Sequence, residues 1–171
     1  PIMGALADRA GLKKRLLAIS LLIGVVAVGL MFFIEQGEWM YAAILFVVAN
    51  IAVNASYVCY DSFLPHIAKP DEMDRVSTAG YALGYVGGGL LLALNLAWIQ
   101  KPEWFGLPHG DGLSPTQATL PTRLAFLSVA IWWLVFSIPL FRDVPEPPAT
   151  GDGKVDVTGA IRELGQTFKR L

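Results

Sequence analysis

Residues 16–34 read LLAISLLIGVVAVGLMFFI, a stretch of 19 residues without a single charge. Three further uncharged runs cover residues 39–60, 76–100 and 124–141. A hydrocarbon core about 30 Å thick takes about 20 helical residues to cross, and about 17–25 are acceptable. Strands of a membrane barrel would be about half as long and would alternate in polarity, which these runs do not. The sequence therefore predicts an all-α membrane protein with four transmembrane helices.

The overall composition agrees with this prediction. Charged residues make up 16% of the chain, against about 25% in an average soluble domain. The charges gather between the uncharged runs, which is the distribution that a bilayer imposes. A formal net charge of −1 gives no indication of a nucleic-acid partner. The lone Cys59 cannot form an internal disulfide.

The runs divide the chain into a membrane part and a tail. Residues 1–143 are expected to form a partial bundle, and its helices are predicted at about 16–34, 39–64, 76–100 and 123–141. Residues 144–171 are expected to form a cytoplasmic segment that opens with a Pro/Gly-rich linker. Apolar residues then recur at helical spacing, which predicts a short amphipathic helix on the membrane face or the start of a further transmembrane helix. These residues are Ile161, Leu164, Phe168 and Leu171.

Lysine and arginine indicate the orientation. Eleven of them lie before the first run, between the second and third, or after the fourth, and only Lys101 and Arg123 lie on the opposite side. The side with eleven is predicted to be cytoplasmic. The long outer loop contains His109 and Asp111, which are too few ligands for a metal site. Neither a metal nor a cofactor is expected.

A short motif precedes the first run: residues 4–15 read GALADRAGLKKR. Gly4 lets a helix end approach another backbone closely, and Gly11 permits a tight turn with positive φ. Asp8 and Arg9 place opposite charges at the membrane boundary. A generic basic loop would explain the lysines of this stretch but not the spacing of its glycines and its acid.

This motif resembles the signature loop between the second and third helices of major facilitator superfamily transporters, G-x-x-x-D-R-x-G-x-K/R-K/R. The matching positions are Gly4, Asp8, Arg9, Gly11, Lys13 and Lys14. In that family the aspartate belongs to an interdomain charge network that stabilises the outward-facing state, so the resemblance implies this role for Asp8. It also implies that the four runs are helices three to six of an N-terminal six-helix bundle. The chain is then a fragment, and the rest of its own protein is a partner.

One face of the second run is polar. Asn50, Asn54, Tyr57 and Asp61 fall at i, i+4, i+7 and i+11, which places them on one helical stripe. Polar groups in a membrane helix normally face protein or a water-filled cavity. The stripe could line a substrate path, or it could supply hydrogen bonds between helices. Asp61 lies near the cytoplasmic end, where a solvated interfacial role is the alternative to proton coupling.

The third run contains Gly80, Gly84 and Gly88 in two consecutive small-xxx-small steps. Glycines at this spacing form a flat surface on which another helix can pack closely. Helix packing is the favoured interpretation of these glycines, and a sliding or bending surface for transport is the alternative.

Two further stretches resemble the autophagy-protein-22-like branch of the superfamily, also called the UMF1 family. Residues 60–67 read YDSFLPHI and residues 75–88 read RVSTAGYALGYVGG. Members show a Y-N-x-x-L-P segment and then S-x-x-G-x-x-x-G-Y-x-G, so Asp61 stands where asparagine is usual. The resemblance implies a secondary transporter of small solutes that works by alternating access. Fungal members are linked to amino-acid efflux from the vacuole, and a bacterial cytoplasmic membrane is the location expected for this chain.

A membrane-embedded scaffold or enzyme subunit is the alternative function. An enzyme should carry a catalytic constellation at membrane depth. The two histidines, His66 and His109, lie in predicted loops on opposite sides of the membrane. The sequence therefore favours a transporter over an enzyme, with the lipid bilayer and a small-molecule substrate as its partners.

Overall fold

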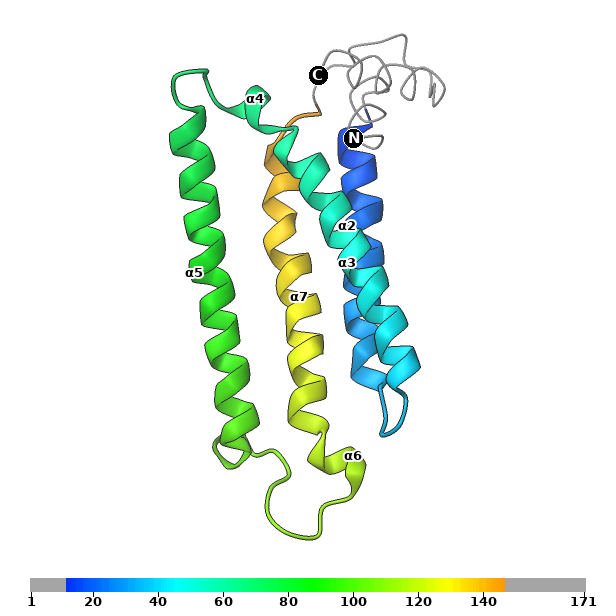
Figure 1. Cartoon of the computed structure of the whole chain (residues 1–171). Helices are drawn as coiled ribbons and strands as arrows, with labels where there is room; N and C mark the ends of the chain where they lie inside the picture. Colours follow the sequence, from blue (N-terminus) through cyan, green and yellow to red (C-terminus); the bar gives the residue numbers. More distant parts are fainter. Residues whose placement is uncertain (1–11, 147–171) are drawn as a thin grey trace, which may run out of the picture.

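The computed structural model describes residues 12–146, and four long helices dominate them (Figure 1). The long helices are α2 (Lys13–Leu30), α3 (Trp39–Asp61), α5 (Met73–Gln100) and α7 (Leu120–Asp143). The short elements are η1 (Met31–Phe33), α4 (Leu64–Ile67), η2 (Pro102–Phe105) and α6 (Pro115–Ala118). All four long helices are long and apolar enough to cross a membrane. The predicted all-α membrane fold with four spans is confirmed.

The helices run up and down, so that α4 and both ends of the described chain lie at one end of the molecule (Figure 1). We call this the α4 end, and the opposite end, which contains α6, the α6 end. The short turn between α2 and α3 lies at the α6 end and includes Gly37, whose φ is +93°. The amide of Glu35 donates to the carboxylate of Glu38 at 2.9 Å and closes this turn.

Helix α2 packs against both α3 and α7, whereas α5 packs mainly on α7. One apolar cluster lies toward the α6 end and joins Ala27 of α2 and Met31 of η1 to Leu45 and Ala49 of α3. A second cluster lies toward the α4 end and joins Leu17, Cys59 and Phe63. Lipid tails are as apolar as these side chains, so van der Waals packing rather than water exclusion holds such helices together.

The helices extend past the uncharged runs at their charged ends. Helix α2 begins at Lys13, α5 at Met73 and α7 at Leu120, so basic residues expected in loops lie in first turns or near them. This extension satisfies backbone groups inside the helix at the membrane boundary. The predicted domain division and the amphipathic helix near the chain's end remain predictions, because residues 1–11 and 147–171 lie outside the described residues.

Candidate functional site

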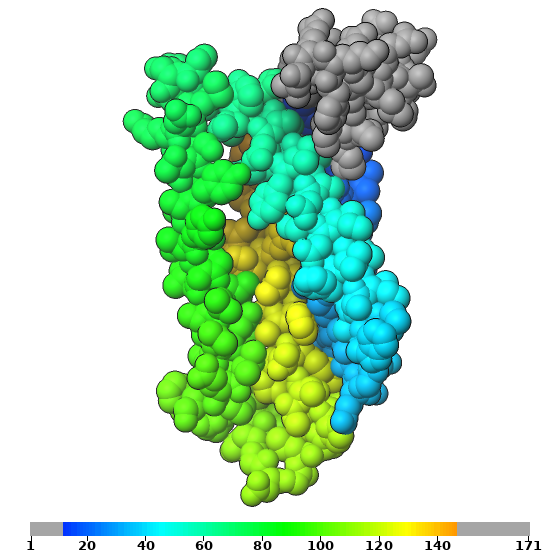
Figure 2. Space-filling view, in the orientation of Figure 1, coloured from blue at the N-terminus to red at the C-terminus, as the bar shows by residue number. Residues whose placement is uncertain are grey.

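A deep groove separates α3 from α5, and α7 forms its floor (Figure 2). This central groove has a volume of about 780 Å³. Its polar lining residues include Asn50 and Tyr57 from α3, Asn95 from α5 and Ser137 from α7. Small-molecule sites commonly occupy clefts of about 300–1,000 Å³ between helices. The groove is therefore the candidate functional site.

A second cavity of about 560 Å³ lies toward the α4 end. We call it the tyrosine cavity, because four tyrosines line it. Its lining residues are Tyr57, Tyr60, Asp61, Phe63, Leu64, Ile67, Val76, Ser77, Gly80, Tyr81, Gly84, Tyr85, Leu140 and Val144. Tyr57 and Gly84 also line the central groove, so the two spaces adjoin.

The two asparagines of the predicted stripe hydrogen-bond to their own helix. Asn50 Nδ2 donates to the carbonyl of Phe46 at 2.9 Å, and Asn54 Nδ2 donates to the carbonyl of Asn50 at 2.7 Å. Asn50 lines the central groove, but Asn54 lines neither space. Both residues are exposed in the part of the chain that the structure describes. Their predicted role in lining a substrate path stays a prediction.

The other two residues of the stripe lie at the α4 end. Tyr57 lines both spaces, and Asp61 lies in the last turn of α3. The Asp61 carboxylate accepts a hydrogen bond from Tyr81 Oη of α5 at 3.5 Å. This distance is near the upper limit of a hydrogen bond. It bridges the ends of α3 and α5 that lie at the α4 end.

The predicted glycine surface on α5 lies mostly along the central groove and not in a contact between the described helices. A Cβ added to Gly84 or Gly88 would meet nothing within 4 Å, and both residues line the central groove. Gly80 lies close to α3, since a Cβ there would be 3.5 Å from Tyr60 Oη. Close helix packing at Gly84 and Gly88 remains a prediction, because none of the described helices covers these glycines.

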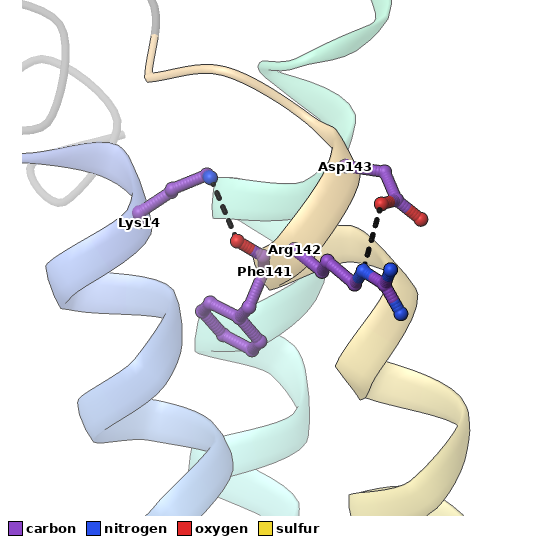
Figure 3. A network of polar contacts seen from close by, with 4 residues as sticks. All are labelled: Lys14, Phe141, Arg142 and Asp143. Carbon is purple, nitrogen blue, oxygen red and sulfur yellow. Dashed lines mark hydrogen bonds and ion pairs between the residues drawn. The ribbon is translucent and has the colours of Figure 1, made fainter.

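The basic end of the signature motif joins three helix ends. Lys13 Nζ donates to the carbonyl of Ser62, just past α3, at 3.3 Å. Lys14 Nζ donates to the carbonyl of Phe141 in the last turn of α7 at 3.0 Å, the contact drawn in Figure 3. The last carbonyls of a helix lack intrahelical donors and carry partial negative charge, so ammonium groups stabilise them.

An acidic side chain also contacts the N-terminal end of α2 at this junction. The backbone amide of Lys14 donates to both carboxylate oxygens of Glu146 at 3.1 and 3.2 Å. Helix α2 has no side-chain cap from Leu12 and no acidic residue in its first turn. Glu146, which follows α7, supplies that missing acceptor. The remaining motif positions, Gly4, Asp8, Arg9 and Gly11, lie outside the described residues.

Sequence reasoning missed two polar contacts between helices. Ser128 Oγ of α7 donates to Asn95 Oδ1 of α5 at 2.9 Å, and Asn95 is only 7% exposed. At the α6 end, Arg123 Nε donates to the carbonyl of Phe32, and its guanidinium lies 4.7 Å from the centre of the Phe32 ring. An asparagine within an uncharged run and an arginine on the outer side were the signals available.

It also missed the glycine that permits the closest helix packing. Gly24 of α2 is buried, and an added Cβ would overlap the indole of Trp133 in α7 and lie 3.3 Å from Ala52 Cβ in α3. Gly24 therefore occupies the point where the three packed helices meet. The sequence offered only a small residue inside an apolar run, without the repeat that drew attention to the third run.

Comparison with known proteins adds the family. The family model described as "Vacuole effluxer Atg22 like" matches residues 1–171. The chain is 28% identical over its full length to the uncharacterized MFS-type transporter YxiO of Bacillus subtilis, and covers 38% of that protein. It is 23% identical to autophagy-related protein 22 of Yarrowia lipolytica over 206 aligned residues, which cover 85% of this chain and 33% of the relative.

No solved structure matches the chain. It spans about a third of the length of these relatives. The family description and the name of the Bacillus subtilis relative indicate a transporter rather than an enzyme. The predicted resemblance is confirmed, since the family model covers every residue of the chain. With its four membrane-spanning helices, this multi-pass membrane chain belongs to the Atg22-like family of vacuole effluxers within the MFS-type transporters.

Proposed function

We propose that the protein carrying this chain is a secondary transporter of small solutes, with amino acids as the substrate class, and that it works by alternating access. The observation that carries the proposal is the family match over all 171 residues. The central groove supports it, since a space between spanning helices that carries a few polar groups can hold a small solute away from the lipid.

The packing suggests how the chain would contribute to such a cycle. Helices α2, α3 and α7 are joined at the α4 end by Lys13 and Lys14, so they form one unit. Helix α5 is held to α7 by the Asn95–Ser128 hydrogen bond and to α3 by the long contact from Tyr81. Transporters of this kind move bundles of helices as bodies around a site near the bilayer midplane. We place one wall of that site on α3 and α5.

The positive-inside pattern supports an orientation with the α4 end on the cytoplasmic side. We propose a bacterial cytoplasmic membrane as the location, in line with the Bacillus subtilis relative. The α4 end contains Lys13, Lys14, Arg15, Lys69, Arg75 and Arg142, and the α6 end contains Lys101 and Arg123. Cysteines introduced at Gly37 and Gly110 should react with an impermeant reagent from outside intact cells. A cysteine at Lys69 should react only after the cells are opened. The reverse pattern would contradict this orientation.

Transport itself is tested with the full-length protein in proteoliposomes. Proteoliposomes loaded with a mixture of amino acids should exchange radiolabelled amino acid faster than protein-free vesicles loaded in the same way. The exchange rate should saturate as the concentration of amino acid rises. Asp8→Asn should slow this exchange while leaving the amount of inserted protein unchanged, as the motif resemblance implies. Exchange no faster than in protein-free vesicles for amino acids, sugars and organic acids alike would refute the proposed function.

A further inference from the structure

We propose that the tyrosine cavity binds the ammonium group of a small organic cation, an inference that deepens the transport function proposed above. Asp61 is the charged residue among those lining this cavity, and no lysine, arginine or histidine lines it within residues 12–146. A single carboxylate with no base among the lining residues gives the cavity wall a negative charge. Its charge therefore favours cations and disfavours anions.

The Asp61 carboxylate has capacity for a ligand. An ionised carboxylate has about four lone-pair positions that can accept hydrogen bonds. Tyr81 Oη donates to Oδ1 from 3.5 Å, which is a long contact. Asp61 is an exposed residue in the described chain, at the point where α3 ends. An ammonium group in the cavity would supply the charged donor that this carboxylate can accept.

The cavity also has the aromatic surface that organic cations require. Tyr57 and Tyr60 come from α3, and Tyr81 and Tyr85 follow one another by one helical turn on α5. Between 47% and 80% of the surface of each tyrosine is exposed. Aromatic ring faces attract cations within about 6 Å of the ring centre, and such rings form the cages that recognise quaternary ammonium ligands.

The size and the walls of the cavity restrict the ligand class. Its volume of about 560 Å³ accommodates a small organic molecule. Gly84 adds no side chain to the wall, and a Cβ there would meet nothing within 4 Å. Leu140 and Val144 of α7 add apolar surface. One carboxylate among apolar and aromatic groups is a poor site for a hard metal cation, which takes several oxygen ligands. An alkylammonium group fits both the charge and the rings.

The test uses the purified full-length protein in detergent and two probes of nearly the same shape. Choline carries a quaternary ammonium, and 3,3-dimethyl-1-butanol is its neutral carbon analogue. Isothermal titration should show choline binding about tenfold more tightly than the neutral analogue, because only choline is attracted by the carboxylate and the ring faces. Sodium at the same concentration should not displace choline.

Three variants locate the site. Asp61→Asn keeps the size of the side chain and should weaken choline binding about tenfold, removing the preference over the neutral analogue. Tyr81→Phe keeps the ring and should retain choline binding within about threefold. Tyr85→Leu removes a ring and should weaken choline binding more than Tyr81→Phe does. Tyr41→Leu is the matched control for Tyr85→Leu, because Tyr41 is also an exposed tyrosine but does not line the cavity. A size-exclusion profile like that of the wild type establishes that each variant is folded.

Equal binding of both probes would overturn the proposal, and so would unchanged choline binding by a folded Asp61→Asn variant. A further transmembrane segment that filled the cavity would abolish binding of both probes, which also overturns it. The proteoliposome assay keeps this result separate from the proposed function. Amino-acid exchange without choline binding would refute the cation site alone, and choline binding without any solute exchange would refute the transport function alone.

Discussion

Replacing Gly24 with alanine should destabilise the packed unit of α2, α3 and α7. An ideal Cβ at Gly24 would lie 2.5 Å from Trp133 Cζ3 and nearer still to Cη2, with Ala52 Cβ at 3.3 Å on the other side. Carbon atoms prefer separations of about 3.5–4.0 Å, so the indole or a whole helix must shift by about 1 Å. Overpacking of this kind costs about 1–3 kcal/mol, and overlap with two ring atoms places Gly24→Ala near 3 kcal/mol.

The higher helix propensity of alanine offsets about 1 kcal/mol of this cost. The expected net loss is therefore about 2 kcal/mol in the free energy of unfolding. Gly29→Ala is the matched control on the same helix, because its nearest atom would be Ala130 Cβ at an ordinary 3.9 Å. That control keeps the propensity gain without the overlap, so it should be unchanged or stabilised by about 1 kcal/mol.

The assay is reversible unfolding of the full-length protein in mixed micelles, followed by circular dichroism as the denaturing detergent increases. A double-mutant cycle adds Trp133→Phe, whose smaller ring should relieve the overlap and recover most of the loss caused by Gly24→Ala. The reasoning is refuted if the two alanine variants shift stability in the same direction by the same amount. It is equally refuted if Trp133→Phe does not change the effect of Gly24→Ala.

Three further contacts give predictions for the same unfolding assay. Ser128→Ala should cost about 1 kcal/mol because it leaves the buried Asn95 oxygen without its donor, and a loss no larger than the scatter of repeat measurements would contradict this. Lys14→Met keeps the apolar stem but removes the ammonium from the end of α7, so we expect a loss of about 1 kcal/mol. Lys14→Arg should retain most of the stability. Equal losses for the two variants would contradict the role of charge. Arg123→Gln should lose about 1 kcal/mol, because it removes the charge at the end of the α2–η1 segment and over the Phe32 ring. Full stability of this variant would show that the contact contributes nothing.

The sequence alone determined the four membrane spans and the family. A transmembrane helix satisfies its own backbone hydrogen bonds, so its existence depends on a local run of about 20 apolar residues. Residues 16–34 and the three later runs met that condition without any knowledge of their neighbours. The motif at residues 4–15 is likewise local, and the family match over the whole chain agrees with it.

The helix partners were decided only by the tertiary structure. A membrane helix is apolar on all sides, so hydrophobic periodicity does not show which face packs against protein. The repeat at Gly80, Gly84 and Gly88 therefore drew attention, while the buried contact formed at Gly24, whose partners lie 28 and 109 residues away in sequence at Ala52 and Trp133. Which small residue is buried depends on how helices from distant parts of the chain fit together.

The partners of the polar side chains were likewise decided by how distant helices fit together. From the sequence, Lys14 indicated the side of the membrane and a motif position but not its partners, because Phe141 and Glu146 lie more than 120 residues away. Asn50 and Asn54 looked like one continuous stripe with Asp61, yet their amides donate to carbonyls of their own helix, whereas Asp61 accepts a hydrogen bond from α5. Helical spacing places side chains on a face, whereas the packing of α5 across the groove decided which of them meet a partner.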